Sequence, residues 1–181
     1  VENNFGHDYL KDFEQRFVLK PRQPVATGWE RIDEVCKGGL GRRELGVVIA
    51  PTGAGKSMVL AHIGSQAVKE GKTVVHYTLE LADAVVGHRY DSCISKVPLS
   101  DLFRNKEKIF DIVKDIEGQL IIKEYPTKSA STSTLKSHIE KLKKRGVEPD
   151  LIIVDYADLL RPVRNSSEKR HELENIYEEL R

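Results

Sequence analysis

The sequence predicts an α/β fold in which helices flank a mostly parallel central sheet. Short apolar runs at residues 47–49, 73–79, 120–122 and 151–154 alternate with segments of helical periodicity, an order typical of parallel sheets. A glycine-bearing loop separates the first apolar run from the helix that follows it. The last run ends in Asp155, where the carboxyl edge of such a sheet is expected.

The length and composition are those of one globular domain. The chain has 181 residues, a formal net charge of +1 and 31% charged residues, and a domain of this size buries roughly 70% of its unfolded surface. Since acids and bases nearly cancel, any nucleic-acid site must be local rather than a consequence of bulk charge. Cys36 and Cys93 fit no CxxC or CxxH pattern, which predicts two small buried thiols in a reducing compartment.

The sequence also argues against several other classes of protein. No segment reaches the apolar length of a membrane span and no charged-then-apolar leader opens the chain, so we expect a cytoplasmic protein without membrane partners. The first residue is Val rather than Met, which suggests a part excised from something longer. The histidines have no metal-ligand spacing, so a catalytic zinc is not expected. They are His7, His62, His76, His88, His138 and His171.

An amphipathic helix is predicted near the start of the chain, over residues 8–17. Its apolar face consists of Tyr9, Leu10, Phe13 and Phe17. Either this face packs on its own domain or the segment is a linker helix that docks on a neighbouring subunit, and the sequence leaves both open. Two prolines within residues 20–24 then favour extended backbone and indicate a tether.

A second helix is predicted to open with a capping box. Thr27 can accept from the backbone of Glu30, whose carboxylate can reach back to the helix start. Its apolar face is formed by Trp29, Ile32 and Val35. The paired glycines at 38–39 are expected to end it.

Residues 46–57 predict a strand, a phosphate-binding loop and a helix in succession. The apolar run at 47–49 suits a strand buried on both faces, and a helix is expected over residues 56–69. Gly53 and Gly55 permit backbone conformations that a Cβ would forbid. Free N–H groups at the helix start favour anions, Lys56 adds a charge for the terminal phosphates, and the Ser57 hydroxyl can ligate Mg²⁺. The segment fits GxxxxGK followed by Ser or Thr, except that Ala50 replaces the first glycine. Nucleotide contacts are therefore predicted for Pro51, Thr52, Gly53, Ala54, Gly55, Lys56, Ser57 and Met58.

Glu80 is a candidate catalytic carboxylate. It stands just past the predicted strand at 73–79, and ligands bind outside the carboxyl ends of strands in an open parallel sheet. Glu80 could orient, or take a proton from, the water that attacks a γ-phosphate. The alternative is a surface acid at a helix start, stabilised by the helix dipole.

The middle of the chain is predicted to be mostly helical. Three helices are expected within residues 82–118, the third lined by Ile109, Phe110, Val113 and Ile116, before a strand at 120–122. A run of hydroxyl residues at 128–134 offers several N-caps for a helix whose inward residues are Leu135, Ile139 and Leu142. The basic residues at 141–145 are interpreted as a solvated helix end rather than a DNA site.

Asp155 supplies the second nucleotide-binding signal. It ends the apolar run at 151–154, where a Walker B acid would hold Mg²⁺ through water or Ser57. Asp158 is a second acid with less favourable placement. The loop at 161–170 leaves the same edge, and its basic side chains could contact nucleic-acid phosphates. These candidates are Arg161, Arg164, Lys169 and Arg170. A last helix with Leu173, Ile176, Tyr177 and Leu180 on one face is expected to pack on the sheet.

These motifs, in this order, resemble the ATPase domain of DnaB-like replicative helicases, which belong to the RecA-like group of P-loop NTPases. The motifs are at residues 27–33, 38–40, 50–57, 77–80 with Arg89, and 151–156. The resemblance covers residues 25–181 and makes residues 1–24 a linker helix and tether. It implies that Lys56 and Ser57 bind phosphate and Mg²⁺, that Glu80 is the catalytic carboxylate, and that Asp155 is the Walker B acid.

The resemblance also implies a function and partners. It predicts an ATP-dependent helicase motor that uses ATP and Mg²⁺, moves on single-stranded DNA during replication and works as a homo-oligomer, expected to be a hexamer, in a bacterial or virus-infected cell. The loop at 161–169 matches the region of the DNA-binding loop in that family. A RecA-like ATPase without unwinding, of recombinase or signalling type, and a nucleotide-gated assembly module are the alternatives.

Two parts of that family's domain have no counterpart before Arg181. One is a strand with a polar γ-phosphate sensor, which lies between the phosphate-loop strand and the Asp155 strand; the other is a trans-acting arginine finger. We therefore expect a core truncated at its C-terminal side, with an internal gap in the sheet that leaves backbone groups unpaired unless relaxation or another chain fills it. Hydrolysis is expected to be weak, since loss of a finger costs roughly 10³–10⁵ in turnover.

Overall fold

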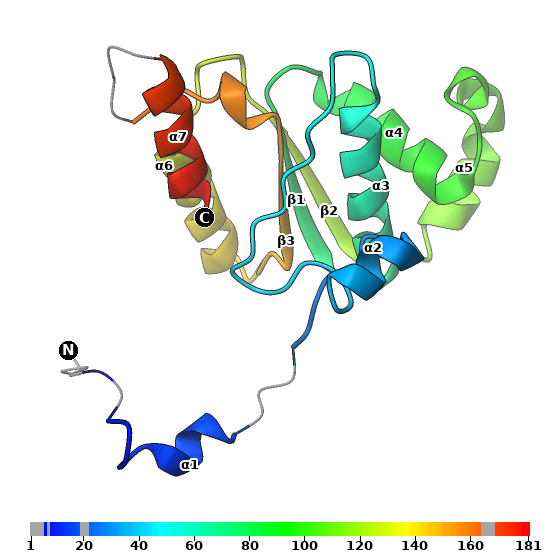
Figure 1. The fold of residues 1–181 in the computed structure, drawn as a ribbon. Coiled ribbons are helices and arrows are strands. Elements are labelled where there is room, and N and C mark those ends of the chain that lie inside the picture. Colours follow the sequence, from blue (N-terminus) through cyan, green and yellow to red (C-terminus); the bar gives the residue numbers. More distant parts are fainter. Residues whose placement is uncertain (1–5, 7, 19–21, 164–168) are drawn as a thin grey trace.

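Helices cover both faces of a three-stranded parallel sheet, which confirms the predicted α/β fold (Figure 1). The computed structural model describes residues 6, 8–18, 22–163 and 169–181. The strands are β1 (Thr73–Thr78), β2 (Gln119–Glu124) and β3 (Leu151–Asp155). Their order is β2-β1-β3, so β1 is central and pairs in parallel with both neighbours.

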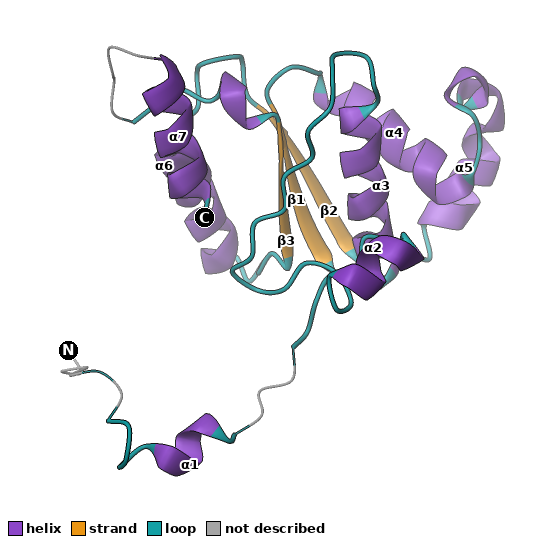
Figure 2. Cartoon of the chain, in the orientation of Figure 1, coloured by secondary structure: helices purple, strands orange, loops and turns teal. Residues whose placement is uncertain are grey.

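The helices lie in two layers around the sheet (Figure 2). The described helices are α1 (Phe13–Arg16), α2 (Glu30–Val35), α3 (Lys56–Lys69), α4 (Asp83–Ser95), α5 (Lys106–Val113), α6 (Thr132–Lys144) and α7 (Lys169–Leu180), with short 3₁₀ turns at Leu99–Asp101, Phe103–Asn105 and Ala157–Leu159. On one side, α3 contacts β1 and β3, and α4 contacts β2. On the other side, α6 and α7 pack together. None of these helices is long and apolar enough to cross a membrane.

The core is built on the two faces of β1, whose side chains alternate between the layers. Val75 and Tyr77 are fully buried in the cluster that includes α6 and α7, where Ile176 is 1% exposed. Val74, on the opposite face, is buried with Ala67 of α3. The predicted packing of the last helix over the sheet is therefore confirmed. The predicted inward residues of α6 are also confirmed, since Leu135 and Leu142 are buried and Ile139 packs on the same cluster.

The strand predicted at residues 47–49 is absent. Residues 45–50 are drawn as a loop in Figure 2, and no described backbone group pairs with residues 46–49. Val47, Val48 and Ile49 are consequently 51%, 36% and 89% exposed. A buried strand requires a neighbouring strand to satisfy its backbone, and none lies beside this run in the described part of the chain. Because this strand does not form, the described sheet ends at β3, and the internal gap that was expected is not observed.

The capping box predicted at Thr27 is also wrong. Helix α2 begins at Glu30 after Trp29, and no side chain caps its first turn. Instead Asp33 reaches backwards and accepts from the backbone N–H groups of Thr27 and Gly28 and from the Thr27 hydroxyl, at 2.8–3.1 Å. Desolvation opposes ionisation of Asp33, but these hydrogen bonds outweigh it and lower its pKa. Gly38 follows the helix as expected.

Three other expectations are wrong, on the bounds of two helices and on the burial of side chains. The helix expected over residues 8–17 is reduced to Phe13–Arg16, because a short helix cannot offset its nucleation cost without a packed face. Tyr9, Leu10, Phe13 and Phe17 are all exposed. Helix α5 ends at Val113 rather than near 118, and Phe110 is 63% exposed. Cys36 is exposed and Cys93 is half-buried, so two buried thiols are not found.

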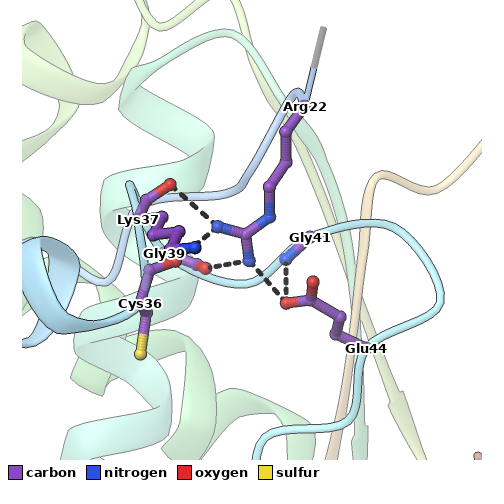
Figure 3. Close-up of polar contacts among 6 residues, drawn as sticks. All are labelled: Arg22, Cys36, Lys37, Gly39, Gly41 and Glu44. Carbon is purple, nitrogen blue, oxygen red and sulfur yellow. Dashed lines mark hydrogen bonds and ion pairs between the residues drawn. The ribbon is translucent and has the colours of Figure 1, made fainter. Parts of the chain in front are cut away.

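Arg22 fastens the end of the tether to the core (Figure 3). Its guanidinium donates to the backbone oxygens of Cys36, Lys37 and Gly39 and to the carboxylate of Glu44. Glu44 also accepts from the Gly41 N–H at 2.8 Å. That backbone hydrogen bond, then the Arg22 contact, lowers the pKa of Glu44. Arg22 thus holds the chain against residues 36–44, three residues before the antiparallel bridge between Val25 and Leu40.

We expect Arg22→Ala to loosen this attachment. Loss of the guanidinium leaves three carbonyls without their donor, so amide hydrogen exchange at Val25 and Leu40 should accelerate at least several-fold and the Tm should fall. The matched control is Lys114→Ala, which removes an exposed ion pair with Asp111 on α5. Equal exchange rates in the two variants would contradict the role given to Arg22.

Candidate functional site

The turn before α3 has the backbone that a phosphate-binding loop requires. Helix α3 begins at Lys56, as predicted, and Gly55 at its N-cap has φ +94°. Gly53 has φ +78°, and a Cβ at either glycine would meet no atom within 4 Å. Glycine is therefore needed here for its left-handed backbone rather than for space. The loop leaves N–H groups at the start of α3 available for an anion.

Lys56 connects this loop to the end of the sheet. Its Nζ donates to the backbone oxygens of Ala50, at 3.0 Å, and Pro51, at 3.4 Å. The same Nζ lies 6.0 Å from the centroid of the Tyr156 ring. Tyr156 directly follows Asp155, so the loop lysine and the carboxyl end of β3 lie in one region of the molecule.

The Asp155 carboxylate lies at the end of β3 and is only 2% exposed. No described residue donates a hydrogen bond to it. A buried carboxylate costs free energy unless something compensates its charge. Ser57, in the first turn of α3, is half-buried, and its hydroxyl likewise has no partner among the described residues. One carboxylate and one hydroxyl oxygen are ligands that suit Mg²⁺, so the donor set fits that ion.

Glu80 lies at the same edge, two residues after β1 ends at Thr78. The register pairs Thr78 with Asp155, and the Leu79 N–H donates to the Asp155 backbone oxygen at 2.9 Å. Glu80 is exposed and its carboxylate contacts no described side chain. Asp155 and Glu80 therefore leave the sheet at its carboxyl edge, and helix α3 begins at that edge (Figure 1). A carboxylate placed there can reach a phosphate held by the loop.

The basic candidates lie beside this edge rather than in it. Arg161 is exposed, and its backbone N–H donates to the Ala130 backbone oxygen at 2.7 Å. A hollow of about 430 Å³ is lined by Ser131, Ser133, Arg161, Pro162 and Val163. Lys169 and Arg170 are exposed in the first turn of α7. Arg164 lies outside the described residues. Asp158, the second acid, accepts from the Tyr177 hydroxyl at 2.9 Å and so fastens α7.

A buried His76–Tyr90 pair beneath the site was missed by the sequence analysis. His76 is fully buried, and its Nδ1 lies 2.9 Å from the Tyr90 hydroxyl on α4, while its Nε2 has no hydrogen-bond partner among the described residues. Burial, then the charge of Arg89, lowers the pKa of His76 to about 4. Burial, with Cys93 and Asp155 nearby, raises the pKa of Tyr90. The only sequence signal was a histidine inside an apolar strand.

These groups form no metal site of histidine and cysteine type. Across the described ranges, no three His, Cys, Asp or Glu side chains cluster in a way that could hold a metal ion alone. An ion at Asp155 would need oxygen atoms from a bound phosphate as well. That need is typical of Mg²⁺, which is held by one or two protein groups together with substrate phosphates.

Comparison with known proteins identifies relatives of this arrangement. The family model of the DnaB-like helicase C terminal domain matches residues 24–181. The DnaB-like replicative helicase of Enterobacteria phage T4 is 30% identical over 172 residues, which cover 88% of this chain and 36% of that protein. The chain thus spans about a third of the length of the curated relative that it matches.

Two solved structures share the fold. One is of a DnaB-like replicative helicase and its interactions with primase; it has a TM-score of 0.75 and 13% identity and covers 97% of this chain and 45% of the other. The second, of an ATPase domain, has a TM-score of 0.73 and 14% identity over 93% of this chain and 62% of the other. At these identities the likeness concerns the fold alone.

We expect the His76 pair to make stability sensitive to acid. The folded pKa is about 4 and the ordinary value is 6.5, so below pH 6.5 the unfolded chain binds a proton that the folded protein excludes. The free energy of unfolding should therefore fall by about 2 kcal/mol from this group between pH 7 and pH 5. Urea titrations of wild type and His76→Phe measure it, since the variant should lose less stability over that range.

The exposed His171→Gln variant is the control and should keep the wild-type acid sensitivity. A His76→Phe protein that loses stability between pH 7 and pH 5 as steeply as wild type would contradict the assignment to this pair.

Proposed function

Because the chain belongs to the DnaB-like helicase C-terminal domain family, we propose that it is the ATP-hydrolysing motor of a replicative DNA helicase, which couples ATP hydrolysis to translocation on single-stranded DNA. The observation that carries the proposal is the placement of Lys56 between the phosphate loop and the residue after Asp155. Family membership favours this function over a RecA-like ATPase without unwinding and over a nucleotide-gated assembly module.

The loop and the start of α3 would hold the triphosphate. The turn before α3 is exposed, and the backbone N–H groups at the start of the helix, where the dipole favours anions, would bind the phosphates. Lys56 now donates to two uncharged carbonyls, and a phosphate is a stronger acceptor for an ammonium group. We infer that Lys56 exchanges these carbonyls for terminal phosphate oxygens when ATP binds.

Two acids would complete the site, each with its own task. Ser57 and Asp155 would hold Mg²⁺, which neutralises charge that develops on the phosphates when it is bound. Glu80 would orient the attacking water and take its proton, because its carboxylate is free at the same edge. The difference in environment agrees with this division, since Asp155 is buried against the sheet and Glu80 is exposed.

Single-stranded DNA is the partner proposed for the basic residues. Arg161, Lys169 and Arg170 flank the segment 164–168 and are all exposed, and Arg164 within that segment is a fourth candidate. No aromatic side chain lies among residues 161–170, so the contacts would be to phosphates rather than to bases. Such contacts suit a motor that moves along any sequence.

The division of the chain and its assembly are part of the same proposal. Residues 1–24 would be a linker helix and tether, and residues 25–181 the RecA-like core. The apolar side chains of α1 and its flanks contact no core cluster and are exposed, as a helix that docks on a neighbouring subunit requires. We propose a homo-oligomer, a hexamer in the full-length protein, that works in the cytoplasm of a bacterium or a virus-infected cell.

Substitutions of Lys56 and Glu80 should separate binding from turnover. Lys56→Ala removes the charge beside the phosphates, so the Kd for MgATP should rise at least tenfold. Glu80→Gln keeps the shape of the side chain but not its basicity, so binding should be unchanged and kcat should fall at least a hundredfold. Glu70→Gln, in the exposed turn after α3, is the control for loss of a carboxylate. Calorimetric titration measures the Kd for MgATP and phosphate release measures kcat. Wild-type values of both quantities in both site variants would refute the assignment of the site.

A triple Arg161→Ala, Lys169→Ala and Arg170→Ala variant should bind single-stranded DNA less tightly. Each phosphate contact contributes about −0.7 to the slope of log K against log salt, so loss of three should make the slope shallower by about 2. Removing Lys141, Lys143 and Lys144 from the exposed end of α6 is the charge-matched control. Fluorescence anisotropy at several salt concentrations measures the slope of log K against log salt. The same slope in both variants would count against the proposed surface.

A further inference from the structure

We propose that Thr78 is a positioning residue for Glu80, whose hydroxyl fixes the turn that carries this carboxylate. The inference rests on the proposed function, which makes Glu80 the group that orients the attacking water. Thr78 is the last residue of β1 and is fully buried. Glu80 follows it by two residues and is exposed.

The Thr78 hydroxyl closes the turn around Glu80. Its Oγ1 donates to the backbone oxygen of Leu81 at 2.7 Å and accepts from the Leu81 N–H at 3.2 Å. One side chain thus satisfies both backbone groups of the residue after Glu80. No described residue other than Leu81 bonds to this hydroxyl.

The backbone of Leu79, the residue before Glu80, is also held by two hydrogen bonds. The Leu79 N–H donates to the Asp155 backbone oxygen at 2.9 Å, and the Leu79 backbone oxygen accepts from the Thr127 hydroxyl at 2.9 Å. The Leu79 side chain is 2% exposed in the core cluster that contains Tyr77. Glu80 is therefore flanked by two residues whose backbone groups are all fixed, while its own carboxylate remains free.

This arrangement limits where the carboxylate can go. With the flanking backbone held by hydrogen bonds, the position of the carboxylate depends mainly on rotation about the side-chain bonds of Glu80. A general base must come within 2.6–3.2 Å of the atom that gives up the proton. A displacement of about 1 Å at a reacting group can cost about 10²-fold in rate, so a fixed turn favours turnover more than binding.

The sheet does not need the Thr78 hydroxyl. The ladder of β1 with β3 ends at the Thr78–Asp155 pair, and the Tyr125 N–H bonds to the backbone oxygen of Thr78 rather than to its side chain. Valine has nearly the same shape as threonine and would keep both branches of the side chain. A Thr78→Val variant therefore tests the hydroxyl with little change to the packing beneath it.

The test compares Thr78→Val and Thr78→Ser with Glu80→Gln in the complete protein, with single-stranded DNA present. We expect Thr78→Val to lower the kcat for ATP hydrolysis about ten- to a hundredfold and to leave the Kd for MgATP within about twofold of wild type. Thr78→Ser keeps the hydroxyl and should restore most of the lost turnover. When Glu80 is already Gln, Thr78→Val should lower kcat no further, because there is no base left to position.

The outcomes separate the two claims. Wild-type turnover in Glu80→Gln would overturn the proposed function of Glu80. A lowered kcat in Glu80→Gln with wild-type kcat in Thr78→Val would overturn the positioning role alone. Three other outcomes would show a structural role and overturn the inference too. They are an equal loss of kcat in Thr78→Val and Thr78→Ser, a parallel loss of MgATP affinity, and a further loss of kcat in the double variant. Should Thr78→Val fail to fold, Thr127→Val removes the Leu79 contact instead, and it should lower kcat with unchanged Kd.

Discussion

The pairing of β1 with β3 is the constraint on which the rest of the structure depends. Because both strands run the same way and Thr78 lies opposite Asp155, the two chain segments leave the sheet at one edge and side by side. The residues that directly follow are Leu79 and Tyr156, which 77 positions separate in the sequence, and the Leu79 N–H bonds to the Asp155 backbone oxygen. A shift of this register by one residue would turn Asp155 to the other face, away from α3.

The two faces of β1 are built from different chemistry. The α6–α7 side is mostly apolar, and the hydroxyl of its central Tyr77 bonds to His138 Nδ1 at 2.9 Å and donates to the Leu135 backbone oxygen at 3.5 Å. The α3–α4 side carries His76, Thr78 and Asp155, all buried. Buried polar groups destabilise a fold unless they are bonded. The Thr78 hydroxyl and His76 Nδ1 are bonded, so the cost on this side falls on His76 Nε2, which has no partner among the described residues.

Two elements were predicted at the bounds that the structure shows. Helix α3 begins and ends where its periodicity and glycines indicated, and β3 begins at Leu151 and ends at Asp155 as expected. The strand predicted at residues 47–49 does not form, because a strand exists only where another supplies its backbone partners. The cap of α2 failed for a related reason. Two acids lie near Thr27 in the sequence, and in the folded loop Thr27 bonds to Asp33 rather than to Glu30.

The sequence alone determined the α/β class and located the candidate phosphate loop and the candidate acids after β1 and at the end of β3, since spacing and residue type carry these along the chain. Only the tertiary structure decided what surrounds them: the His76–Tyr90 pair, the Thr78 and Thr127 hydroxyls around Glu80, and the Arg22 contacts that end the tether. Each of these joins residues through side-chain geometry rather than periodicity. A hydrogen bond depends on distances and angles that packing fixes, and no pattern in the sequence contains them.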